Sequence, residues 1–117
     1  MPGLQSLKAW TEGKHFARLA YRATMQRPLA QHFSLADQIR RAAASIPANI
    51  AEGYALGTRP QFVRFLRISL GSARELMWHI ELAGDMDLIA ATDAKTLHDA
   101  GDIVIRLLIG LLKKLSG

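Results

Sequence analysis

The chain contains no cysteine among its 117 residues, which excludes disulfides, thiol catalysis and cysteine-based zinc sites. It also lacks a long hydrophobic run. The longest, residues 103–112, contains Arg106 and is much shorter than the roughly 20 apolar residues that span a membrane. No N-terminal segment has the charged and then apolar form of a signal peptide. We therefore expect a cytoplasmic protein without a membrane segment.

Motifs for cofactors and metals are missing as well. The glycines in residues 53–57 are not followed by the Gly-Lys-Ser/Thr of a phosphate loop, and no Gly-x-Ser-x-Gly elbow occurs. Glu75 and His79 are four residues apart, as are His98 and Asp102, whereas carboxylate-bridged di-metal bundles use Glu-x-x-His. The sequence therefore predicts a protein without a cofactor or metal, and not an enzyme.

Strand-like alternation is absent, and the apolar residues recur with the spacing of amphipathic helices. Four helices are predicted, over residues 4–25, from 34 to about 53–57, from 58 onward, and from 92 or 93 to 115. The connections between them are short, which favours antiparallel neighbours. We expect an all-α protein, an up-down-up-down antiparallel four-helix bundle that forms one domain over residues 1–117.

Capping residues mark where three of these helices begin. Ser6 is the expected cap of the first helix. Ser34, with Asp37 three positions later, resembles a capping box at the second. Thr58 is the expected cap of the third, since Pro60 lies in its first turn.

The second and fourth helices carry more apolar surface than a monomeric bundle needs. The back of the second is mostly small, with Ala44, Ala48 and Ala51, and Pro47 interrupts its hydrogen bonding. In the fourth, only a strip around Asp102 and Arg106 is polar. A surface helix needs an apolar stripe of little more than about 100°. The excess predicts burial against other copies, that is, a homo-oligomer.

The charge is distributed unevenly along the chain. The chain has fifteen Lys and Arg and ten Asp and Glu, which gives a net charge of +5. Residues 1–74 hold 11 basic and three acidic side chains, and the remainder holds four basic and seven acidic ones. This polarity suits nucleic-acid binding, and it equally suits head-to-tail docking of subunits.

Two rows of basic side chains are candidates for phosphate contact. The third helix places its arginines on one face with an aromatic residue for base stacking, and the first helix adds a basic row at four-residue spacing. The predicted nucleic-acid-binding residues are Lys14, Arg18, Arg22, Arg64, Arg67, Arg74 and Trp78. The alternative is a solvated basic face, with Trp78 in an oligomer contact.

A polar stripe on the second helix is interpreted as architecture. Helical polar stripes without a nucleophile or metal set usually fix helix register, with charges tolerated because they are paired. The predicted structural polar network comprises Gln38, Arg41, Ser45, Asn49, Glu52 and, as the candidate partner of Arg41 on the third helix, Glu75. An enzyme with a pocket converging on Asn49, Glu52 and Glu75 is the weakest alternative.

Two stretches resemble a known family. RRAAASIPANIAEG, residues 40–53, and FVRFLRISLGSARELMWHIELA, residues 62–83, are similar to the four-helix-bundle proteins encoded by intervening sequences of bacterial 23S rRNA genes. The resemblance implies an up-and-down bundle assembled as a homopentamer. That family is in turn similar to accessory proteins of diversity-generating retroelements, basic oligomers that bind a reverse transcriptase and nucleic acid.

Pattern and resemblance together favour a non-enzymatic homo-oligomer that binds nucleic acid, RNA or an RNA–protein complex, through a basic face. DNA is the other nucleic acid that such a face could bind. The alternative is a protein–protein scaffold for a polymerase-like partner, without direct nucleic-acid binding.

Overall fold

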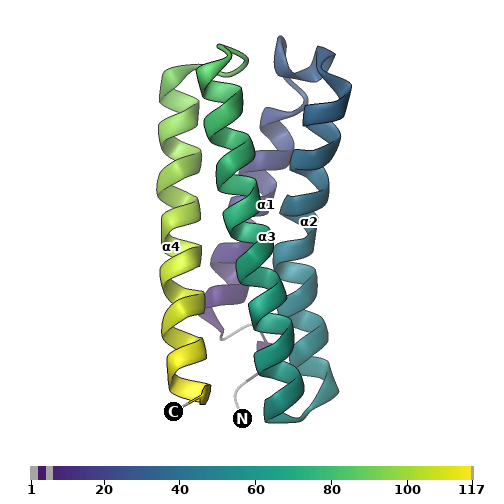
Figure 1. Cartoon of the computed structure of the whole chain (residues 1–117), viewed down its shortest axis with the longest axis vertical. Helices are drawn as coiled ribbons and strands as arrows, with labels where there is room; N and C mark the ends of the chain where they lie inside the picture. Colours follow the sequence, from purple (N-terminus) through teal and green to yellow (C-terminus); the bar gives the residue numbers. More distant parts are fainter. Residues whose placement is uncertain (1–2, 5–6, 117) are drawn as a thin grey trace.

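The computed structural model describes residues 3–4 and 7–116 of the chain. Their regular structure is entirely helical: α1 (Lys8–Ala23), the short 3₁₀ helix η2 (Leu29–Gln31), α2 (Phe33–Leu56), α3 (Arg59–Asp85) and α4 (Ala91–Ser116). The four α-helices run alternately up and down along a molecule 43 Å long, as Figure 1 shows. The predicted up-down-up-down bundle is therefore confirmed for the single chain.

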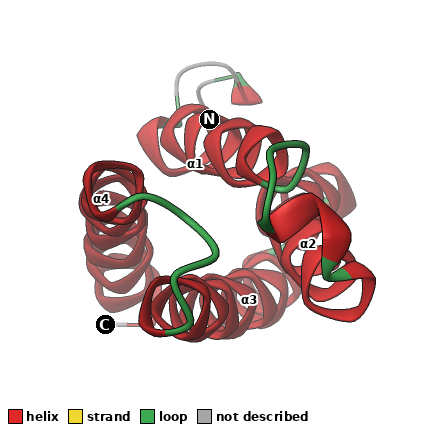
Figure 2. Cartoon of the chain, turned by 90° about the horizontal axis from the view of Figure 1, so that it is seen from above, coloured by secondary structure: helices red, strands yellow, loops and turns green. Residues whose placement is uncertain are grey.

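The helices occupy the corners of a square in chain order. α1 packs on α2 and α4, and α3 packs on the same two helices, so α1 and α3 lie diagonally opposite each other. Figure 2, which looks along the bundle, shows this arrangement. The connections α1–α2 and α3–α4 lie at one end, and the α2–α3 connection lies at the other (Figure 1).

Helix boundaries follow local chemistry, with two differences from expectation. Thr58 caps α3, accepting a hydrogen bond from the Gln61 amide at 3.4 Å, as predicted. By contrast, α2 begins at Phe33, with His32 at the cap position and no side-chain hydrogen bond. The predicted cap at Ser34 is therefore wrong. α1 begins at Lys8, later than expected, and the proposed cap Ser6 lies outside the described residues.

One apolar cluster joins all four helices and η2. Phe16, Ile46, Ile50, Leu66, Leu76 and Leu108 are among its fully buried members. Buried Ser69 is hydrogen-bonded across helices: its hydroxyl donates to the Ile46 carbonyl at 2.9 Å, which joins α3 to α2 beside Pro47. None of the helices in the described residues is long and apolar enough to cross a membrane.

Candidate nucleic-acid interface

The arginines of α3 form a continuous row along its outer side. Arg64, Arg67, Gly71, Arg74 and Trp78 follow one another at spacings of three and four residues, which places them above one another on one helix face. The row covers roughly 21 Å at 1.5 Å per residue. All five residues are exposed, and the Trp78 side chain is 53% exposed. Gly71 has open space where a side chain would stand, so a ligand backbone can approach the middle of the row closely.

These arginines are free of acidic partners within the described part of the chain. The ion pairs found there join Arg41 to Asp37 at 2.9 Å, Arg106 to Asp102 at 3.0 Å, and three further pairs, none of which includes the α3 arginines. Arg64 instead lies over the Phe65 ring, with 5.0 Å between the guanidinium carbon and the ring centroid. The α3 row is thus a line of uncompensated positive charge.

The basic residues of α1 do not extend this row. α1 and α3 lie at opposite corners of the bundle (Figure 2). Arg18 and Arg22 are exposed on α1 and so lie apart from the α3 row. Lys14 is half-buried, with its ammonium nitrogen 3.7 Å from the centroid of the Trp10 ring. The two predicted basic rows therefore form two separate basic surfaces on a single chain.

The predicted polar network forms only in part. Ser45 and Ser72 share a hydrogen bond of 2.7 Å between α2 and α3, and the Asn49 amide donates to the Ser45 hydroxyl at 2.8 Å. Gln38, Arg41 and Glu52 are exposed.

The expected pair between Arg41 and Glu75 is not formed within the chain. The Arg41 guanidinium, 80% exposed, contacts Asp37 on its own helix, and the Glu75 carboxylate contacts His79 at 3.1 Å. An exposed arginine gains as much from a carboxylate one turn away as from one on another helix, and it orders fewer groups in doing so.

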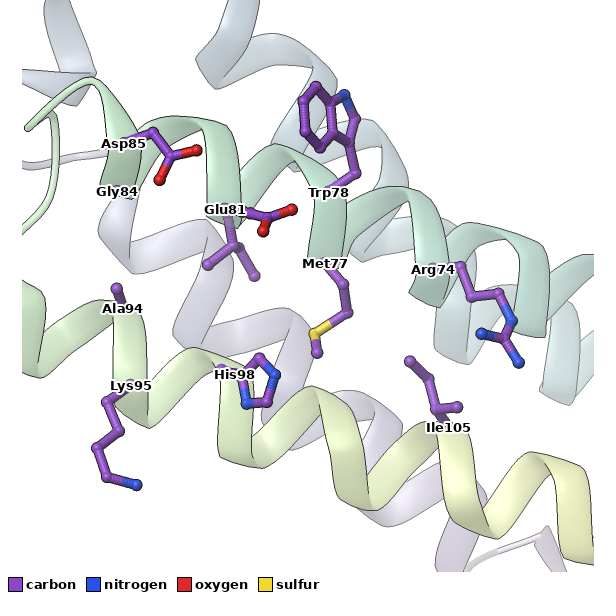
Figure 3. A pocket seen from close by; sticks show the side chains of 11 residues that line it. Arg74, Met77, Trp78, Glu81, Gly84, Asp85, Ala94, Lys95, His98 and Ile105 are labelled. Atoms are coloured by element: carbon purple, nitrogen blue, oxygen red, sulfur yellow. The ribbon is translucent and has the colours of Figure 1, made fainter.

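A groove of about 640 Å³ runs between α3 and α4. Met77 and Ile105 are among its apolar lining residues, and Glu81, Asp85 and Lys95 are among its charged ones. Arg74 and Trp78 also line its rim, so the groove borders the α3 row. Figure 3 shows Met77 pointing from α3 toward α4, whereas the Trp78 ring points away from α4. Beside the groove, the hydrogen bond from Lys95 holds the pKa of Asp99 below its ordinary value. The charges on this rim are mixed in sign, unlike those of the α3 row.

Metal ligands are not assembled in the described residues. No group of three or more His, Asp or Glu side chains there is placed to hold a metal ion. His15, His32 and His98 are exposed, and His79 is buried. A further feature was missed from sequence: Phe33 is 81% exposed at the start of α2, where the predicted helix boundary at Ser34 had left it in a loop.

The geometry defines a class of protein: a basic, all-α, up-and-down four-helix bundle with an arginine row on one outer helix. Residues 5–110 match the 23S rRNA-intervening sequence proteins. The chain belongs to this family. No curated protein matches it.

The fold is also that of a solved relative. It is similar to the 1.70 Å crystal structure of a protein of unknown function from the S23 ribosomal protein family of Bacteroides thetaiotaomicron, with 25% sequence identity and a TM-score of 0.82. The alignment covers 90% of this chain and 95% of that one, so the four-helix architecture is shared along nearly the full length of both.

Proposed function

We propose that the protein is a non-enzymatic, homo-oligomeric helical bundle that binds nucleic acid, RNA or an RNA–protein complex, through the α3 row. The observation that carries this proposal is the run Arg64, Arg67, Arg74 and Trp78 on one exposed helix face, without an acidic partner in the described residues. Arginine is weakly hydrated and binds phosphate with a planar fork of donors. Trp78 adds a surface on which a base can stack.

Self-assembly would bring the two basic surfaces together. In a closed ring, the α1 side of one copy can lie beside the α3 side of the next, so that Arg18 and Arg22 extend a neighbour's row. Five copies is the number that the family resemblance implies. In this arrangement one nucleic acid strand would contact both kinds of basic surface.

Charge reversal of the row tests the proposal directly. We expect the variant R64E/R67E/R74E to bind a short structured RNA about tenfold more weakly or worse at low salt. Its slope of log affinity against log salt should be smaller by about three, because each lost phosphate contact removes close to one unit. Fluorescence anisotropy over a salt series measures both quantities, and circular dichroism checks that the helix content is unchanged.

The matched control is the variant R18E/R22E, which reverses two charges on α1. The proposal that α3 is the primary surface requires this variant to lose less affinity than the α3 variant. If RNA binding and its salt slope are the same in the α3 variant and the parent, the α3 row is not a phosphate-binding surface.

Exposed apolar side chains support the oligomeric part of the proposal. Ile103 on α4 is 47% exposed, and Ala44 and Ala48 form a small, uncharged patch on the outer side of α2 between Arg41 and Glu52. We expect light scattering to give a molar mass several times that of the 12.9 kDa chain. Ile103→Lys should lower that mass if α4 is in the contact, since it places a charge in an apolar interface. A monomer in the parent protein at all concentrations would contradict the assembly.

A protein scaffold is the second candidate, and the α3–α4 groove favours it. An apolar floor between rims of mixed charge is the kind of surface that receives an amphipathic helix of a partner. A polymerase-like partner that stays bound, in fixed stoichiometry, after nuclease treatment would support this function.

A further inference from the structure

A second cleft lies on the other side of α3, between the first turns of α2 and the C-terminal half of α3. Its volume is about 440 Å³. Phe33, Ser34 and Gln38 line it from α2, and Trp78 and His79 line it from α3. Trp78 therefore ends the arginine row and forms a wall of this cleft, and it also borders the α3–α4 groove.

The cleft presents two aromatic rings to solvent. The Phe33 side chain is 81% exposed and that of Trp78 is 53% exposed. Large exposed aromatic side chains that come together from different helices mark an interaction surface, because leaving them in water costs hydrophobic free energy. Both rings offer flat π-faces, which favour a planar ligand.

Polar groups with unused hydrogen-bonding capacity stand beside the rings. The His79 side chain is only 8% exposed, and its Nε2 lies 3.1 Å from the Glu75 carboxylate. A carboxylate oxygen accepts, so Nε2 carries the hydrogen, and Nδ1 is left to accept from a donor. Nδ1 has no hydrogen-bond partner within the described residues. Nδ1 has almost no accessible surface, so it lies behind the cleft wall, and the exposed polar group beside the rings is Gln38.

The electrostatics of the surroundings suit a ligand that carries phosphate. The first turn of α2 contains no acidic residue, and no side chain caps its amide hydrogens, although the Ala36 amide donates to the His32 carbonyl at 2.9 Å. Arg74 lies one turn before Trp78 on α3 and makes no ion pair in the described part of the chain. A strand laid along the α3 row would therefore lead directly to the cleft.

We propose that this cleft binds an unpaired nucleobase against Phe33 and Trp78, with the polar edge of the base toward Gln38 and a neighbouring phosphate on Arg74. The inference rests on the proposed nucleic-acid function and makes it specific: the ligand is a single-stranded segment. A base in a duplex is already stacked and paired, so its faces and edge are not available to the cleft.

The test uses the full-length protein with Trp10→Phe, which leaves Trp78 as the single tryptophan and keeps an aromatic ring under Lys14. A short oligoadenylate is titrated, and beside it an abasic oligonucleotide of the same length and charge. We expect oligoadenylate to quench Trp78 fluorescence and to bind about tenfold more tightly than the abasic strand, the size of one base-stacking contact. A duplex of the same length should not quench.

Phe33→Ala then separates stacking from phosphate binding. We expect it to remove most of the preference for oligoadenylate, while affinity for the abasic strand and the salt slope stay unchanged. Met86→Ala is the matched control, because Met86 is 62% exposed on the connection that follows α3 and does not line the cleft. It should change neither affinity.

The outcomes distinguish this inference from the function on which it rests. If the abasic strand and oligoadenylate bind equally, and both depend on the α3 arginines, the base site is wrong and the phosphate surface stands. If Phe33→Ala lowers the molar mass of the protein alone, the cleft faces another copy, and the base site is again wrong. If neither strand binds at low salt, both proposals fail.

Discussion

Replacing Phe16 with alanine should lower the free energy of unfolding by about 3–5 kcal/mol, the range for deleting a buried aromatic side chain. The Phe16 side chain is completely buried. Its ring lies against the backbone of α4: a Cβ atom on Gly101 would be 2.7 Å from Phe16 Cζ. Alanine at position 16 therefore leaves a cavity between α1 and α4 that neighbouring side chains fill only partly.

Phe33→Ala is the control for this loss. It removes the same atoms from a ring that is 81% exposed, so its effect on stability should stay within about 0.5 kcal/mol. Urea unfolding followed by circular dichroism, at one fixed protein concentration, compares the two variants with the parent. Equal losses in both variants would contradict the placement of Phe16 in the core.

The core of this fold could be predicted from the sequence because the buried residues of a helix recur at the helical spacing. Ile39, Ile46 and Ile50 recur at helical spacing and are all buried, as expected for the inner face of an amphipathic helix. Thr58 was readable for a different reason, since a threonine followed by Pro60 satisfies the start of a helix locally. Features that depend on one helix alone were therefore predicted well.

Features that depend on which helices are neighbours were predicted less well. The stripe Arg64, Arg67 and Arg74 follows from spacing within α3. Whether Arg18 on α1 joins it depends on α1 and α3 being diagonal, which no periodicity encodes. The expected partner of Arg41 was wrong for a related reason. A sequence pattern gives the helix face on which an arginine lies, but it does not give the carboxylate that pairs with it. Arg41 pairs with Asp37 one turn earlier, and Glu75 contacts His79 instead.

The α2–α3 cleft could not be predicted from the sequence, for a third reason. Phe33 lies one residue before the expected helix start, so no helix face could be assigned to it from the sequence. In the sequence His79 stands out only by its spacing from Glu75, and only packing shows that its ring is buried, with no partner for Nδ1 in the described residues. Sites made where two helix ends meet need the register between those helices.

Gly53 was interpreted from sequence as part of the end of the second helix, and its actual position leads to the second large effect. It is a buried residue inside α2, where α2 and α3 approach closely. A Cβ atom at this position would be 2.6 Å from Phe65 Cβ and 3.3 Å from Phe62 Cδ1. Phe65 Cβ is attached directly to the α3 backbone, so no side-chain rotation relieves the overlap.

Gly53→Ala should therefore destabilise the protein by about 1 kcal/mol, the difference between two opposing terms. Alanine gains about 0.5–1 kcal/mol over glycine within a helix, but overpacking of this kind costs about 1–3 kcal/mol and forces the helices apart. Gly110→Ala on α4 is the control, for which we expect the opposite effect on stability. Nothing lies within 4 Å of its added Cβ, so it should raise the free energy of unfolding by about 0.5–1 kcal/mol. The urea unfolding midpoints of both variants and the parent show whether overpacking outweighs the gain in helix propensity at Gly53. If both variants are more stable than the parent, α2 and α3 are not in contact at Gly53, and the close packing that holds the α3 row and the cleft in register is absent there.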